Sequence, residues 1–189
     1  MKSSEESRRR VLDASLQLVA ASGVRAVSFR EVARLAGVSH QTPYHHFGSA
    51  HGILHALAAE GFRGLTAAMA GAADGAGPDP LDALMASGIA YVNFAADHAG
   101  HFRVMFQRPV DPSEPPLAEA GATYGTLERL TGAAHAAGYG ARLPVDVLVG
   151  VCWSVVHGIA SLRAEGHAAA GADPAAVVEG LGRLMRPSG

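Results

Sequence analysis

Apolar residues recur at three- and four-residue intervals along most of the chain, which is the spacing of helices that bury one face. Leu12, Leu16 and Val19 have this spacing near the N-terminus, and Gly23 follows them as a stop signal. No segment shows the two-residue alternation that is typical of a half-buried strand. The pattern therefore predicts an all-α protein.

Stop and start signals divide this pattern into nine predicted helices. Asp79-Pro80, Pro144 and Asp173-Pro174 mark helix starts, because aspartate caps a first turn and proline fits into it. Glycine-rich residues 71–78 and proline-rich residues 109–116 are predicted breaks. The predicted helices cover about 4–21, 28–36, 39–47, 49–69, 80–97, 100–107, 117–137, 144–165 and 174–185.

Residues 28–47 are predicted to form two short helices joined by a tight turn. Ser28 and Glu31 have the Ser-x-x-Glu spacing of a capping box, and Gly37 stands where a left-handed turn ends the first helix. The apolar face of the first helix is predicted to comprise Val32, Leu35 and Ala36.

The second helix of the pair, which Ser39 is predicted to cap, is rich in side chains that form hydrogen bonds. These side chains are His40, Gln41, Thr42, Tyr44 and His46. A short exposed helix of this kind fits the major groove of DNA. The pair therefore predicts a DNA-reading element.

Composition and charge agree with a small soluble regulator. The 189-residue chain is 49% hydrophobic and 17% charged, which indicates a folded core and not a disordered chain. Its one cysteine, Cys152, excludes an internal disulfide and fits a reducing compartment. The polar N-terminus lacks a signal core, and the longest apolar run, 147–156, is expected to be too short to span a bilayer. We therefore expect a cytoplasmic protein.

Charge is distributed unevenly along the chain. Residues 1–50 contain seven basic and four acidic residues, a net charge of +3, whereas the whole chain has −2, which leaves −5 for residues 51–189. Phosphate neutralisation supplies much of the affinity for nucleic acid, so a positive segment on an acidic chain favours a DNA surface within residues 1–50. The alternative is an ordinary solvated face.

Residues 28–49 resemble the DNA-binding domain of the tetracycline-repressor (TetR) family. The matching pattern is Ser28-x-x-Glu31-Val32-Ala33-x-x-Ala36-Gly37-Val38-Ser39-x-x-Thr42-x-Tyr44-x-His46-Phe47-x-Ser49. The resemblance implies a nine-helix fold with a three-helix DNA-binding head over residues 1–50. It also implies a helical ligand-binding and dimerisation body over residues 51–189.

The predicted DNA contacts follow from this resemblance and from hydrogen-bonding chemistry. His40, Gln41 and Thr42 are expected to contact bases, since glutamine can pair with adenine and neutral histidine can donate or accept. The expected phosphate contacts are Ser28, Ser39, Tyr44 and His46. As alternatives, Tyr44 could pack between helices, and Phe47 is expected in the core.

Two positions depart from the family pattern. Ala50 stands where the family usually has lysine, which removes one phosphate contact, and Gln41 is larger than the residue that is common there. A helical sensor or scaffold protein without specific DNA binding stays open as an alternative, and Ala50 is the only residue that favours it.

The body resembles a TetR branch named after its Trp, His and Gly, on the pattern Trp153-x-x-x-His157-Gly158. An unknown small hydrophobic effector is expected in a cavity lined by Tyr91, Phe94, Phe102, Met105, Phe106, Tyr124, Trp153 and His157. The alternative is that these side chains form an ordinary helical core.

A row of small residues on the penultimate helix predicts a close helix contact. Gly150, Ser154 and Gly158 recur at four-residue intervals, and the resemblance implies a homodimer interface there. Packing within the subunit is the alternative. A two-fold dimer would bind a palindromic operator.

No cofactor, metal or enzyme activity is predicted. His51 and His55, and His98 and His101, have spacings that place two ligands on one helix face, but no cysteine accompanies them. The sequence contains no nucleophile motif, phosphate loop or informative carboxylate pair.

Overall fold

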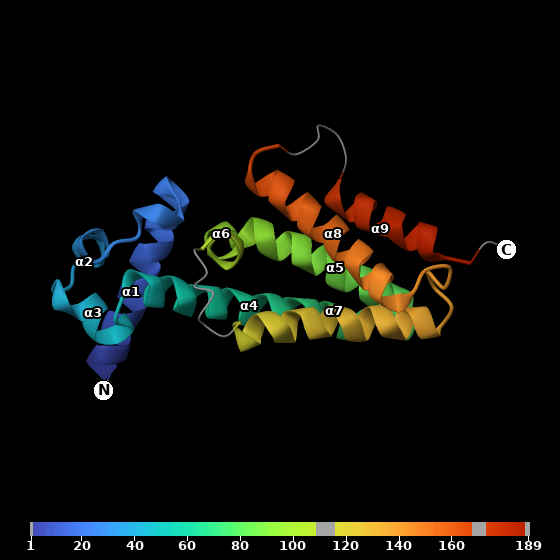
Figure 1. The fold of residues 1–189 in the computed structure, drawn as a ribbon, viewed down its shortest axis with the longest axis horizontal. Helices are drawn as coiled ribbons and strands as arrows, with labels where there is room; N and C mark the ends of the chain where they lie inside the picture. Colours follow the sequence, from blue (N-terminus) through green and yellow to red (C-terminus); the bar gives the residue numbers. More distant parts are fainter. Residues whose placement is uncertain (1, 109–115, 168–172, 188–189) are drawn as a thin grey trace. The chain divides into compact units, whose positions relative to one another are not determined.

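A computed structural model describes residues 2–108, 116–167 and 173–187. Within these residues the chain forms nine α-helices and one short 3-10 helix without any strand, so the predicted all-α fold is confirmed (Figure 1). The chain divides into two compact units, one with residues 1–62 and 98–115 and the other with residues 63–97 and 116–189. The predicted functional division at residue 50 stays a prediction.

The first unit is built around α1 (Lys2–Ser22). Val11, Leu12 and Val19 of this helix are almost fully buried. The helix packs against the other elements of the unit, which are η1 (Val24–Ala26), α2 (Phe29–Ala36), α3 (Gln41–Phe47), α6 (Ala99–Gln107) and the beginning of α4 (Ala50–Asp74). A single long helix therefore supplies the support for the two short ones.

The second unit is centred on α5 (Pro80–Asp97). It packs against α7 (Ala118–Ala136), α8 (Val145–Ala164) and α9 (Pro174–Met185), and Leu81, Tyr91 and Val92 are buried at these contacts. The predicted helix starts are confirmed: Asp79 accepts a hydrogen bond from the Leu81 N–H at 2.9 Å, and Asp173 accepts one from the Ala175 N–H at 3.2 Å.

The predicted break at residues 71–78 is wrong in its first half, because α4 continues through Gly71 to Asp74. Alanines surround Gly71, and their high helix propensity offsets the cost of one glycine, which is about 1 kcal/mol. Of the other predicted break, 109–116, all but Pro116 lies outside the described residues.

The prediction that the longest apolar run is too short to span a bilayer is also wrong. Helix α8 has 20 residues, and an 18-residue window in it has a mean hydropathy of 1.8, which meets the length and composition of a membrane span. The run was underestimated because Ile159, Ala160 and Leu162 continue the apolar segment beyond residue 156. Only 28% of the window is buried, and the other residues of the helix are half-buried or exposed. One such helix is weak evidence for a membrane span.

Candidate nucleic-acid interface

The turn between α2 and α3 has the conformation that its sequence predicts. The Ser28 hydroxyl accepts a hydrogen bond from the Glu31 N–H at 3.4 Å, and Gly37 is left-handed with φ 61° and ψ 40°. The reciprocal half of the capping box is not formed, because the Glu31 carboxylate pairs with Arg34 at 3.0 Å. Glycine is required at position 37 because other residues rarely adopt this conformation.

The buried face of α2 differs from the predicted one at a single position. Val32 and Ala36 are buried as expected, but Leu35 is 39% exposed and Ala33 takes its place. Successive helical residues are about 100° apart, so positions 32, 33 and 36 share one narrow stripe and position 35 lies at its edge. Leu35 is therefore a surface residue.

Two arginines of α1 hold the short helices in place. The Arg10 guanidinium donates hydrogen bonds to the carbonyls of Ala36 and Gly37, at the negative end of the α2 dipole. The Arg8 guanidinium lies 5.3 Å from the centre of the Phe47 ring. Part of the basic charge of the first 50 residues therefore has a structural role.

The beginning of α3 corrects a second prediction. Ser39 does not cap the helix with its side chain, because its hydroxyl is hydrogen-bonded to the Thr42 hydroxyl at 2.8 Å. The Ser39 carbonyl instead accepts the Thr42 N–H at 3.0 Å, and His40 is the cap residue, without a side-chain cap bond. The hydroxyls of Ser39 and Thr42 therefore hold each other at the start of α3.

Most predicted contact residues of α3 face solvent. His40 and Gln41 are exposed, Thr42 and His46 are half-buried, and Ser28 and Ser39 are exposed before their helices. Tyr44 is 65% exposed and places its ring edge-to-face with Phe29 of α2 at 6.1 Å. The alternative in which Tyr44 packs between α3 and α1 is therefore wrong, because the ring is exposed and its printed contact is with α2. Phe47, expected in the core, is half-buried.

One exposed residue of α3 was missed by the sequence analysis. His45 follows Gln41 by four residues, so both lie on the same exposed side of the helix. The helical period alone, applied to α3, would have identified it. Buried Pro43 marks the opposite side of α3.

The connection from α3 to α4 is very tight. Ser49 accepts the Gly52 N–H at 2.9 Å and so caps α4. A Cβ atom at position 52 would lie 2.1 Å from the Phe47 carbonyl oxygen, so only glycine fits. This close approach fixes the start of α4 against the end of α3.

Helix α6 is held to α1 and α4 by polar contacts. Glu60 of α4 binds Arg9 at 2.8 Å and His101 of α6 at 3.1 Å, and Arg103 donates to the Val19 carbonyl at 3.1 Å. Burial lowers the pKa of His101, against the opposing effect of Glu60. Burial alone would raise the pKa of Glu60, but Arg9 and His101 lower it overall.

Four of the predicted ligand residues form one cluster in the second unit. The Tyr91 hydroxyl and the Nδ1 atom of His157 are 2.9 Å apart, and the Trp153 ring lies 5.7 Å from His157 and 6.2 Å from Tyr124. Tyr91 is buried, whereas Trp153 and Tyr124 are each 42% exposed. Burial lowers the pKa of His157 and raises the pKa of Tyr91.

The other predicted ligand residues lie in different surroundings. Phe102 and Phe106 belong to the first unit, where their ring centres are 4.9 Å apart. Phe94 is buried in α5 and Met105 in α6. The cavity that was predicted from all eight side chains stays a prediction.

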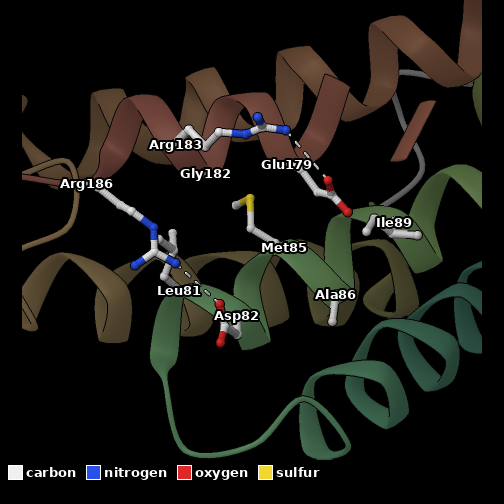
Figure 2. A pocket seen from close by; sticks show the side chains of 9 residues that line it. All are labelled: Leu81, Asp82, Met85, Ala86, Ile89, Glu179, Gly182, Arg183 and Arg186. Atoms are coloured by element: carbon white, nitrogen blue, oxygen red, sulfur yellow. Dashed lines mark ion pairs between the residues drawn. The ribbon is translucent and has the colours of Figure 1, made fainter. Parts of the chain in front are cut away.

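A groove of about 380 Å³ lies between α5 and α9, and Figure 2 shows its apolar floor and charged rim. Its floor includes Leu81, Met85 and Ile89, and none of the predicted ligand residues lines it. At the rim, Arg186 pairs with Asp82 at 3.7 Å and Arg183 pairs with Glu179 at 3.8 Å. The two positive and two negative side chains of the rim therefore neutralise each other.

The rings of each predicted histidine pair lie close together. The ring centres of His51 and His55 are 6.4 Å apart, and those of His98 and His101 are 6.2 Å apart. Across the described ranges, no group of three or more His, Cys, Asp or Glu side chains could hold a metal ion.

Two family models match the chain. Residues 84–185 match the tetracyclin repressor-like C-terminal domain, and residues 11–57 match the bacterial regulatory proteins of the tetR family. Membership of the branch named after Trp, His and Gly stays a prediction. No curated protein matches the chain.

Several solved structures are similar to the chain over nearly its whole length. A protein of unknown function from Rhodococcus sp. RHA1 is 31% identical, with a TM-score of 0.81, and the match covers 95% of this chain and 93% of that one. The TetR family regulator PfmR from Thermus thermophilus is 22% identical, with a TM-score of 0.75 and coverages of 93% and 96%. A tetR family regulatory protein from Rhodococcus RHA1 is 24% identical, with a TM-score of 0.71 and coverages of 97% and 98%.

Proposed function

Since this chain belongs to the TetR family of bacterial transcription regulators, we propose that it is a ligand-responsive repressor that binds a palindromic operator as a homodimer. The observation that carries the proposal is the exposed polar side of α3, with His40, Gln41 and Tyr44 facing solvent. Regulators of this family are DNA-binding proteins and are generally not enzymes.

The DNA contacts divide into two groups by position. His40 and Gln41 lie at the exposed start of α3, where a helix inserted in the major groove presents side chains to base edges. Ser28, Ser39, Tyr44 and His46 carry donors suited to phosphate oxygens. The position of these polar side chains on α3 favours a DNA reader over a sensor without DNA binding, and only Ala50 favours that alternative.

Loss of the base contacts should reduce selectivity more than total affinity. We expect His40→Ala and Gln41→Ala each to lower the preference for a selected duplex over its scrambled version by about 5- to 100-fold, as expected for base contacts of 1–3 kcal/mol. Competition binding at fixed salt measures this preference, and His135→Ala in α7 is the matched control. Unchanged preference in both variants, or no preference in the wild-type protein, would contradict the proposal.

The proposed dimer surface lies on α8 and α9. On α8, Val147, Val151, Ser154 and Gly158 follow one another at helical spacing on the side opposite the buried residues. On α9, Val177 is 39% exposed and Leu184 is 85% exposed, with Leu181 between them on the same side. A groove of about 610 Å³ is lined by Val151, Leu181 and Leu184, so the two stripes adjoin.

The small residues of α8 favour a second copy of the chain over packing within the subunit. A Cβ atom added at Gly150 or Gly158 would meet nothing within 4 Å, so no contact within the chain requires glycine there. Such small residues let a partner helix approach closely. The apolar surface of α8 is then covered by the partner, and we propose a cytoplasmic protein.

A charge on this surface should separate the dimer without unfolding the subunit. We expect Leu184→Glu to weaken dimerisation by at least about 100-fold, because burial of an unpaired charge costs about 3–5 kcal/mol. Sedimentation velocity measures the assembly state, and circular dichroism confirms that the helices remain.

The control is Val145→Glu, at an exposed position in the first turn of α8 that lies off the stripe. It should leave the dimer intact. A dimer that resists Leu184→Glu, or a wild-type protein that is monomeric at tens of micromolar, would argue for another interface or none.

The proposed effector site is the cluster of Tyr91, Tyr124, Trp153 and His157, to which Phe102 and Phe106 are added only from the sequence pattern. Three aromatic rings and one polar pair suit a small hydrophobic compound with a hydrogen-bonding group. Repression is then relieved when the effector binds one conformation of the dimer more tightly than the other.

Trp153, the chain's single tryptophan, provides the readout for effector binding. Compounds that change its emission should also weaken DNA binding. Tyr91→Phe should reduce their affinity by about 3- to 10-fold, as expected for one neutral hydrogen bond. The control is Tyr139→Phe, which removes a hydroxyl that donates a hydrogen bond to Asp79 at 3.0 Å. No response across a broad library of small apolar compounds would count against the site.

A further inference from the structure

In the part of the proposed DNA-reading surface between Arg34 and Glu60, only histidine side chains can change their charge near neutral pH. Between Arg34 and Glu60 the sequence contains no Asp, Glu, Lys or Arg, and Lys2 is the only lysine of the chain. The same segment contains five of the ten histidines, namely His40, His45, His46, His51 and His55. The net charge of this segment therefore depends on imidazole protonation.

Four of these histidines lie on or next to the exposed side of α3. His40 and His45 are exposed on α3, and His46 is half-buried there. His51 lies in the first turn of α4, and the close approach at Gly52 holds this turn against the end of α3. The surface that reads bases is thus flanked by imidazoles at both ends.

Four arginines near this surface already have partners in the protein. Arg10 binds carbonyls at the end of α2, Arg34 pairs with Glu31, and Arg9 pairs with both Asp13 and Glu60. The Arg8 guanidinium lies over the Phe47 ring. The remaining charged or titratable groups on the surrounding elements come from α1, η1, α2, α3 and α6. They are Lys2, Glu5, Glu6, Arg25, Arg30, Tyr44, His101 and Arg103, with His98 directly before α6.

We propose that operator binding by this chain takes up protons, with His45 and His51 joining His46 as phosphate ligands. The inference rests on the proposed DNA-binding function. Protonation of His45 and His46 raises the net charge of residues 1–50 from +3 to +5, and His51 adds one more charge next to Ala50, where the family cation is missing.

The direction of the pH dependence follows from linkage. The ordinary pKa of histidine is about 6.5, and a neighbouring phosphate favours the protonated form. The affinity for DNA is therefore highest when the pH is below the ordinary pKa of histidine. It falls as the pH rises through the higher pKa that histidine has in the complex with DNA. Acidification tightens DNA binding.

The first experiment measures the affinity for DNA at two pH values. The probes are a rhodamine-labelled 30-base-pair duplex selected by the protein from a random pool and its scrambled version, at constant ionic strength. The dissociation constant should be at least about 10-fold lower at pH 6.0 than at pH 8.0. The slope of log affinity against log salt should also steepen by about 0.9 for each histidine that contacts a phosphate.

A double substitution assigns the effect to particular residues. The readout is the ratio of the dissociation constants at pH 8.0 and pH 6.0, which does not depend on absolute affinity. His45→Gln with His51→Gln keeps hydrogen-bonding groups but cannot gain charge, so the ratio should fall at least about 3-fold. The control, His135→Gln with His167→Gln outside this segment, should keep the wild-type ratio. An unchanged ratio in the test variant overturns the assignment.

Calorimetry of the wild-type protein gives a measurement that needs no variant. Binding enthalpies at pH 6.8 in two buffers of different ionisation enthalpy should show uptake of at least one proton per subunit. This inference is overturned if the protein binds DNA selectively but takes up no proton, and if its dissociation constants at pH 8.0 and pH 6.0 differ by less than twofold. The proposed function would then still stand. Failure to bind either duplex selectively at both pH values overturns the proposed function as well.

Discussion

The close approach of α4 to the end of α3 is the constraint on which the proposed DNA surface depends. A side chain at position 52 would collide with the Phe47 carbonyl, so the helices meet there through backbone alone. Arg8 and Arg10 of α1 hold α3 and α2 from the other side. The exposed side of α3 is therefore rigidly presented although the helix has only seven residues, too few to be stable alone.

Helix α8 combines three kinds of surface, and this combination explains its composition. One side is buried against its own unit, a second carries Trp153 and His157, and the third is the stripe of small and apolar residues that we assign to the dimer. An effector that contacts the second side acts on the same rigid helix that forms the proposed dimer contact. The proposed roles account for the apolar character that resembles a membrane span.

The sequence predicted the helices well because their signals are local. Asp79 and Asp173 cap helices as expected, and Gly37 turns the chain where it was predicted to. The errors came from features that depend on neighbours in space. Leu35 lies at the edge of the buried face of α2, and the Ser39 hydroxyl binds the Thr42 hydroxyl and not the backbone. Helix α4 continues past Gly71 because alanines surround that residue. His45 was missed because the family pattern, and not the helical period, guided the choice of contacts.

The central claim is that two copies of α3 read one symmetric DNA site. Selection of bound duplexes from a random pool by the full-length protein tests it most directly. The account predicts an inverted repeat whose half-sites are centred about one helical turn apart, roughly 34–36 Å. Enrichment of a single unrepeated half-site, or of no sequence at all, would contradict it.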